Sequence, residues 1–201
     1  MKKISLISSL AFLFLFSSCS KIDPITAHMD GHTNLIKKII SAEGEIGAQY
    51  EYNADCTLSK GVYAGEDFVL KREGNTLTLI APGPYYTGHY TLNNAGQINS
   101  EYQTVEGDGS DWTYNENGQL IGIGKSCKFE WKDGNLTNAY YLYNDGSVAQ
   151  SEIYTYSSDV TTSNFDYALY VVCSGMEFIH NGYYGKPSKN ICTGVYDGQN
   201  N

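Results

Sequence analysis

A short phrase that recurs through the middle of the chain constrains the fold more than any other feature. Two aromatic or apolar residues, separated by one residue, precede an Asn or Asp, and a Gly and then an apolar residue usually follow. Asn, Asp and Gly tolerate the positive φ angles of tight hairpin turns, and residues two apart point to the same face of a strand. Each phrase therefore predicts a β-hairpin. The phrases begin at Tyr50, Tyr90, Trp112, Phe129 and Tyr141, and a related turn lies at Glu73-Gly74-Asn75.

The spacing of these turns predicts how the strands are joined. Parallel strands need a crossover of a dozen or more residues, which the short intervals between the turns do not provide. The chain of 201 residues also holds 18 Tyr and 21 Gly but only 4 Pro, a mixture that favours strands and turns. We therefore predict an all-β fold over residues 34–160, an antiparallel up-and-down meander that forms a curved sheet or a partial barrel.

The end of the chain departs from this pattern. Residues 164–175 form a mixed apolar run behind a Ser163/Asn164 cap, which predicts a short helix, although the valines in the run would suit a strand equally well. We expect Phe165, Leu169 and Val172 to pack on the meander. Residues 161–201 are thus predicted to be a covering segment of the same domain.

The beginning of the chain is typical of an exported protein. Lys2 and Lys3 precede an apolar run over residues 4–16, which is too short to cross a bilayer as a helix. Ser17 and Ser18 then stand directly before Cys19, as in a lipobox, although Phe16 occupies the position where Leu is usual. We predict a signal peptide at residues 1–18, lipid attachment at Cys19 and a linker at residues 19–33. An ordinary secretory signal that happens to end near a cysteine is the alternative.

Two resemblances to known proteins rest on these motifs. The stretch from Trp112 to Leu120 resembles the YD-type repeat of large bacterial surface and toxin-encapsulating proteins. The chain as a whole resembles a group of Bacteroidota-type lipoproteins of unknown function with a porin-like fold. The shared order is a lipobox, a first strand over residues 35–39, an aromatic-Asn-Gly meander and a closing segment that ends at residues 185–190. This resemblance implies a curved, nearly closed antiparallel sheet and no catalytic residue.

The charge of the chain excludes some partners. Removal of residues 1–18 takes away two lysines and no acid, so that 11 basic and 22 acidic residues remain and the net charge changes from −9 to −11. Such a surface repels nucleic acid and anionic lipid head groups. We therefore expect no nucleic-acid partner, and membrane contact through the lipid alone. This places the protein at the bacterial envelope, on the periplasmic or surface side of the outer membrane.

The remaining cysteines allow two disulfides. Cys56, Cys127, Cys173 and Cys192 form an even set in an exported chain. We expect Cys173 to pair with Cys192, which would fasten the terminal segment, while buried free thiols are the alternative. The set has no metal-binding spacing, and we predict neither a metal site nor a cofactor.

The functional prediction is general. No nucleophile elbow, zinc-binding helix or phosphate loop occurs, so that no catalytic residue is predicted. The rings of Trp112, Tyr114, Trp131 and Tyr143 are a candidate ligand face, but at strand spacing such rings also form cores. We predict a binding or structural module whose partner is another envelope protein or a glycan. The alternative is an envelope hydrolase, either a glycosidase or a peptidase.

Overall fold

The computed structural model describes residues 15–18, 34–40, 46–54, 57–63, 65–81, 87–103, 109–160, 166–169 and 182–198. Fourteen strands lie within these residues. They are β1 (Leu15–Ser18), β2 (Asn34–Ile40), β3 (Ile46–Tyr52), β4 (Leu58–Tyr63), β5 (Glu66–Glu73), β6 (Thr76–Ile80), β7 (Thr87–Leu92), β8 (Ile98–Gln103), β9 (Gly109–Tyr114), β10 (Leu120–Ile123), β11 (Cys127–Lys132), β12 (Asn135–Leu142), β13 (Val148–Val160) and β14 (Asn190–Asp197).

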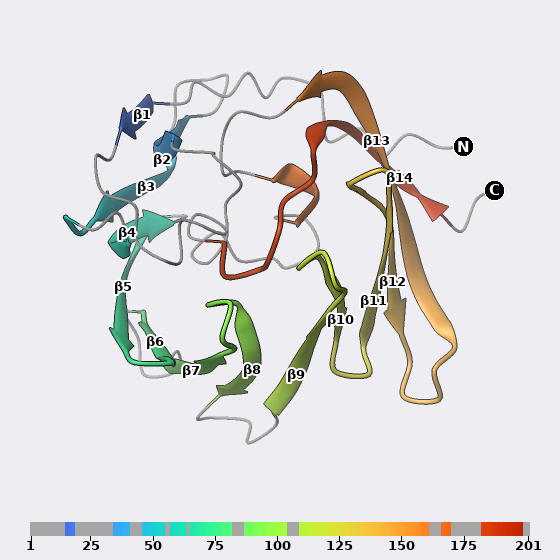
Figure 1. Cartoon of the computed structure of the whole chain (residues 1–201), viewed down its shortest axis with the longest axis horizontal. Coiled ribbons are helices and arrows are strands. Elements are labelled where there is room, and N and C mark those ends of the chain that lie inside the picture. The colour runs from blue at the N-terminus through green and yellow to red at the C-terminus, as the bar shows by residue number, and fades with distance from the viewer. Residues whose placement is uncertain are drawn as a thin grey trace.

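All fourteen strands belong to one sheet in which every strand pairs with its neighbours in the chain. The spatial order runs from β1 to β14 without a crossover, and each ladder is antiparallel. Figure 1 shows the strands following one another around an arc. No ladder joins β14 to β1 among the described strands, so that the sheet is curved but open. The predicted antiparallel meander is confirmed.

The recurring phrase forms the predicted hairpins, and its Asn has a specific role. In the turn between β7 and β8, Asn93 Oδ1 accepts hydrogen bonds from the N–H groups of Ala95 (2.9 Å) and Gln97 (3.0 Å), while Asn93 Nδ2 donates to Gln97 Oε1 (3.0 Å). The Gly that follows has a φ of 77° at Gly96, in the left-handed region. Asn115, Gln119 and Gly118 repeat this arrangement between β9 and β10.

Successive turns of a meander alternate between its two ends. Most of the recurring phrases form every second turn, so these turns lie at the same end of the strands. The turns after β3, β5, β7, β9 and β11 share one end, which we call the Asn rim; its described residues are 53–54, 57, 74–75, 93–97, 115–119 and 133–134. The turn at residues 143–147, which belongs to the phrase that starts at Tyr141, lies at the opposite end. The phrase is therefore a device for making a turn and does not mark one face or one site.

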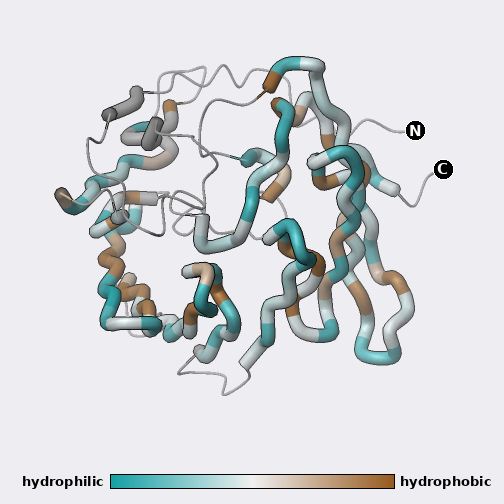
Figure 2. Tube along the Cα trace, viewed as in Figure 1, coloured by the Kyte–Doolittle hydropathy of each residue, from teal (hydrophilic) through white to brown (hydrophobic). Residues whose placement is uncertain are grey.

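The inner face of the arc is apolar, whereas the outer face is mainly polar and carries a few exposed apolar side chains such as Val69 and Ile121. Along β5, Phe68 and Leu70 are buried while the residues between and beside them are exposed. Hydrophobic and hydrophilic residues alternate along other strands as well (Figure 2). Leu77, Ile98, Leu120 and Leu136 are almost completely buried in one core cluster that extends across the sheet. This period-two pattern is expected of an antiparallel sheet with one face in water.

The end of the chain covers the inner face. Residues 167–169 form one helical turn, and Ala168 and Leu169 belong to the core cluster. Residues 182–189, which we call the strap, run across the inside of the arc before β14 begins (red in Figure 1). The predicted packing of Leu169 is confirmed, whereas Phe165 and Val172 lie outside the described residues.

The strand expected at residues 35–39 forms as β2, and β1, which lies within the predicted signal peptide, pairs with it in antiparallel register. One local expectation was wrong. The helical turn is capped by Asp166, whose Oδ1 accepts hydrogen bonds from the N–H groups of Ala168 (2.9 Å) and Leu169 (3.4 Å). The predicted cap at Ser163 and Asn164 was placed too early because all three residue types can cap a helix, and sequence alone does not distinguish them.

Candidate functional site

The candidate ligand face is divided between the core and the surface. Trp112 is 7% exposed and belongs to the core cluster, against which the half-buried Tyr114 and Trp131 are packed. Tyr143, in contrast, is 61% exposed at the turn between β12 and β13. The structure therefore does not bring the four rings onto one exposed face. Alternation along a strand places Trp112 and Tyr114 on the same side, but that side faces inward and is covered by the strap.

The strap makes specific contacts with these rings. The ring of Tyr184 stacks on Trp112 with a centroid separation of 5.1 Å and an interplanar angle of 27°. Tyr114 Oη donates hydrogen bonds to the carbonyl oxygens of Ile98 (2.8 Å) and Tyr183 (3.3 Å). Trp112 Nε1 is buried and has no acceptor among the described residues. A buried donor without an acceptor costs free energy, and the residues packed around Trp112 leave its N–H group without a hydrogen bond.

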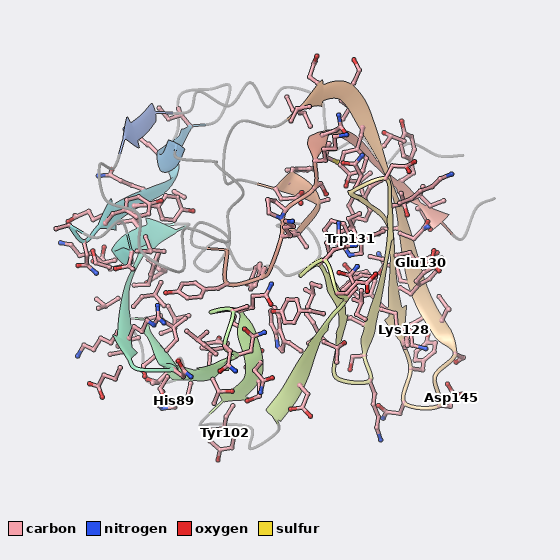
Figure 3. All side chains as sticks on the ribbon, in the orientation of Figure 1. His89, Tyr102, Lys128, Glu130, Trp131 and Asp145 are labelled. Carbon is pink, nitrogen blue, oxygen red and sulfur yellow. The ribbon has the colours of Figure 1, made fainter. Side chains whose placement is uncertain are left out.

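Trp131 is held by the sheet itself. Its Nε1 donates a hydrogen bond of 2.7 Å to the carbonyl oxygen of Leu120 on the neighbouring strand β10. Trp131 lies among the strands β10 to β12, while Asp145 marks the tip of the next hairpin (Figure 3). Its indole therefore has a structural bond that a ligand would have to compete with.

A buried carboxylate joins the helical turn to the strap. Asp166 is 4% exposed, and its Oδ2 accepts a hydrogen bond from Ser188 N–H in addition to the two bonds from the helical turn. Ser188 Oγ accepts a hydrogen bond from Leu136 N–H (3.2 Å) and lies 3.1 Å from Tyr156 Oη. Burial raises the pKa of Asp166 above its ordinary value, because its hydrogen bonds to Ser188, Ala168 and Leu169 only partly offset the lost hydration.

A second buried carboxylate is surrounded by tyrosines. Glu152 on β13 accepts hydrogen bonds from the hydroxyl groups of Tyr154 and Tyr141, the latter at 3.3 Å. Burial and the neighbouring Glu152 carboxylate raise the pKa of Tyr154. Burial likewise raises the pKa of Tyr156, which donates a hydrogen bond of 2.7 Å to the carbonyl oxygen of Leu136. Asp166 and Glu152 thus both accept hydrogen bonds from donors of the protein itself.

The outer face carries exposed polar side chains. Glu130 Oε2 accepts hydrogen bonds from Asn138 Nδ2 (2.9 Å) and Tyr140 Oη (3.0 Å) across the ladder between β11 and β12. His89 Nδ1 lies 3.4 Å from Thr78 Oγ1, and the 52% exposed Tyr102 projects outward beside it (Figure 3). Within the described ranges, no three His, Cys, Asp or Glu side chains come together in a way that could hold a metal ion.

Two of the five cysteines lie in the described part of the chain. Cys127 and Cys192 are free thiols, and burial raises the pKa of Cys192 to about 12. Cys19, Cys56 and Cys173 lie outside the described residues. The lipid attachment at Cys19 therefore stays a prediction. The free thiol of Cys192 in this structure disagrees with the predicted pairing with Cys173, and a thiol count under denaturing, non-reducing conditions decides between the two.

Sequence reasoning missed the polar residues that organise the interior. Asp166 lies in the run predicted to be helical and Ser188 in the closing segment, but neither of them, nor Glu152, was predicted to be a site residue. Gln97 and Gln119 follow the Asn-x-x-Gly phrase directly, and this repetition was a signal that could have found them. Both are buried, and Gln97 Nε2 donates to the carbonyl oxygen of Gly118 (2.9 Å), which joins two turns of the Asn rim.

Comparison with known proteins supports the fold alone. No protein-family model matches the chain, and no curated protein matches it by sequence. Among solved structures, it is similar to the crystal structure of a porin-like protein from Bacteroides uniformis, with a TM-score of 0.51 and 13% identity. The match covers 75% of this chain and 72% of that one. The fold thus defines the class of the protein, which is a curved antiparallel meander similar in structure to a porin-like protein. The porin-like part of the resemblance agrees with this neighbour, whereas the lipoprotein and YD-repeat parts have no match.

Proposed function

We propose that this chain is a lipid-anchored protein of the bacterial cell envelope whose sheet serves as a binding or structural module. The positive, apolar and small residues that lead to Cys19 support the anchor. The structural similarity to a porin-like Bacteroides protein fits an envelope location. Among the described residues, no helix is long and apolar enough to span a bilayer.

The distribution of polarity in the sheet is the observation that carries this proposal. Phe68, Tyr90 and Phe129 point inward, whereas Lys71, Thr91 and Lys128 lie on the exposed face of the same strands. A sheet embedded in lipid must turn apolar side chains outward. The observed arrangement therefore favours a domain that lies in water and is held beside the membrane by a separate anchor.

The anchor also affects the first strand. β1 (Leu15–Ser18) lies within the predicted signal peptide and pairs with β2 in the whole chain. Cleavage before Cys19 removes β1, so that β2 becomes the first strand of the mature sheet. The linker of residues 19–33 then leads from the lipid to that strand.

The partner in this proposal is another envelope protein or a glycan, and it meets the outer face. Most of the large aromatic rings are used inside, whereas hydroxyl, amide and charged groups cover the outside of β6 to β8 and of β11 and β12. The cluster of Glu130, Asn138 and Tyr140 is such a group. Polar groups of this kind recognise hydroxyl-bearing or polar ligands through hydrogen bonds.

Metabolic labelling with radioactive palmitate tests the anchor. We expect label in the wild-type protein and none in Cys19→Ala, because the thiol of Cys19 is the proposed attachment point. Cys127→Ala is the matched control and should be labelled like the wild type, since Cys127 lies on a strand of the folded domain. Equal labelling of wild type and Cys19→Ala would disprove the lipid anchor. Membrane fractionation of the same three proteins then shows whether the anchor alone holds the chain.

A further inference from the structure

The strap is attached to the sheet in an unusual way. Its backbone forms single hydrogen bonds with successive turns and strand ends of the Asn rim, where ordinary strands form continuous ladders. Ile98 N–H donates to the carbonyl oxygen of Tyr183 (2.9 Å), Lys186 N–H to that of Gly118 (2.8 Å), and Lys189 N–H to that of Gly134 (3.0 Å). Because the ladders from β8 to β14 do not include these bonds, the strap can detach while the sheet stays intact.

The buried carboxyl group of Asp166 holds the strap through a hydrogen bond. Asp166 accepts the N–H of Ser188, and Ser188 in turn binds Leu136 and Tyr156. Among the described residues, the ionisable groups that face the Asp166 carboxyl are Tyr156 from β13 and Cys192 from β14, both of which are neutral acids at pH 7. Lys189, next to Ser188 in the chain, is exposed to solvent. No cation among the described residues compensates the charge of the Asp166 carboxylate.

We propose that the strap is a detachable cover and that ionisation of Asp166 governs its release. A carboxylate that is buried without a cation is unfavourable, whereas in the released state water solvates the charge. The covered state therefore prefers the protonated carboxyl and the released state prefers the ionised one. The pKa of Asp166 is raised in the covered state, so the strap is held most firmly in acid. It loosens as the pH rises above about 4, the ordinary pKa of an aspartate, which applies to the released state.

Release of the strap uncovers the inner aromatic rings. Tyr184 leaves the face of Trp112, and the backbone at Gly185 leaves the ring of Tyr114, to which a Cβ at that position would lie within 2.8 Å. Trp112 Nε1, which has no acceptor in the covered state, then gains access to one. The use of these rings for a ligand would rest on the proposed binding function, but the release itself does not.

Hydrogen exchange followed by mass spectrometry measures the release in the detergent-solubilised full chain. Exchange of peptides that cover the strap is compared between pH 5 and pH 8 after division by the intrinsic rates. Peptides over β5 and β6 (residues 66–80), which form none of these hydrogen bonds with the strap, serve as internal controls. We expect strap protection to fall with rising pH by up to about tenfold per pH unit, over the range in which only the covered state keeps the proton. The control peptides should show no such dependence.

Two variants separate the role of Asp166 from that of other acids. Asp166→Asn cannot ionise and should show strap exchange that is independent of pH. Glu152→Gln removes the other buried carboxylate, which lies on β13, and should keep the pH dependence of the wild type. Wild-type strap protection that is equal at both pH values, or stronger at pH 8, would overturn the proposal, as would the same dependence in Asp166→Asn. If Asp166→Asn does not fold, the wild-type and Glu152→Gln measurements still decide, because pH-independent protection in the wild type contradicts the mechanism. Palmitate labelling fails or succeeds independently of these outcomes.

Discussion

Position 185 requires glycine for two separate reasons. Its φ is +92°, in the region that side chains with a Cβ rarely adopt. A Cβ at this position would also lie only 2.6 Å from the carbonyl oxygen of Gly118. The residue therefore allows the strap to approach the turn of the Asn rim closely enough for Lys186 N–H to reach Gly118. A single missing side chain thus sets the distance between two segments that are far apart in the sequence.

Gly185→Ala should lower the free energy of unfolding by about 3 kcal/mol, because the left-handed backbone strain and the steric overlap add. Gly146→Ala is the matched control, since Gly146 has a similar φ of +83° but open space around it. We expect this variant to lose only about 1 kcal/mol, the cost of the backbone conformation alone. Urea denaturation of both variants measures the difference. Equal losses would show that the close approach at Gly185 has no energetic importance.

At the scale of the element, the Asn-x-x-Gly-Gln turn is a self-contained unit. Asn115 binds the N–H groups of Asn117 and Gln119 through Oδ1 and the side chain of Gln119 through Nδ2. Gly118 provides the left-handed residue, with a φ of 76°. All of these partners lie within four residues, so that the turn is determined locally. This locality explains why the hairpins could be predicted from the sequence.

Asn115→Ala should destabilise the protein by about 1–2 kcal/mol, because Gln119 is buried and loses partners for both its N–H and its side chain. Asn144→Ala is the control in the turn between β12 and β13, where the side chain is exposed and makes no hydrogen bond within the described part of the chain. We expect less than about 0.5 kcal/mol for this surface change. Thermal unfolding of the two variants provides the comparison. A similar loss in both would refute the specific role of the Asn side chain.

The interior polar contacts could not be predicted in the same way. Tyr184 meets Trp112, and Ser188 meets Leu136 and Tyr156, across long stretches of sequence that contain no signal for the pairing. Period two places Trp112 and Tyr114 on one face of β9, but it does not show which face is inward. That choice depends on how the sheet curves and on what covers it. The sequence therefore identified the rings of the candidate ligand face, but it did not predict the strap that covers Trp112 and Tyr114.

At the scale of the whole molecule, the arc encloses acids that must keep their protons. The pKa values of Tyr154 and Tyr156 are raised by burial, and the pKa of Cys192 is raised to about 12. A group whose pKa is higher in the folded state than in the unfolded state adds stability that is lost as the pH rises. These three groups therefore make the fold sensitive to alkali.

We expect the free energy of unfolding to fall steadily as the pH is raised above about 9, where the unfolded chain starts to release these protons while the folded chain retains them. Tyr154→Phe should show a shallower decline, because one such group is removed. Tyr143→Phe, at an exposed turn, controls for the loss of a hydroxyl group. Denaturation in urea at pH 8, 9 and 10 measures the slopes. A slope in Tyr154→Phe as steep as in the wild type would exclude Tyr154 as a source of the alkaline sensitivity.

The position of the strap near the end of the chain has a consequence for biosynthesis. A ribosome makes the hairpins from β3 to β13 before it makes residues 182–189, which cover the inner face. During that interval, no strap covers Trp112 and the leucines around it, and the apolar inner face of the sheet is open to contact with other molecules. The synthesis of residues 182–189 is therefore also the step after which the apolar inner face is no longer exposed to aggregation.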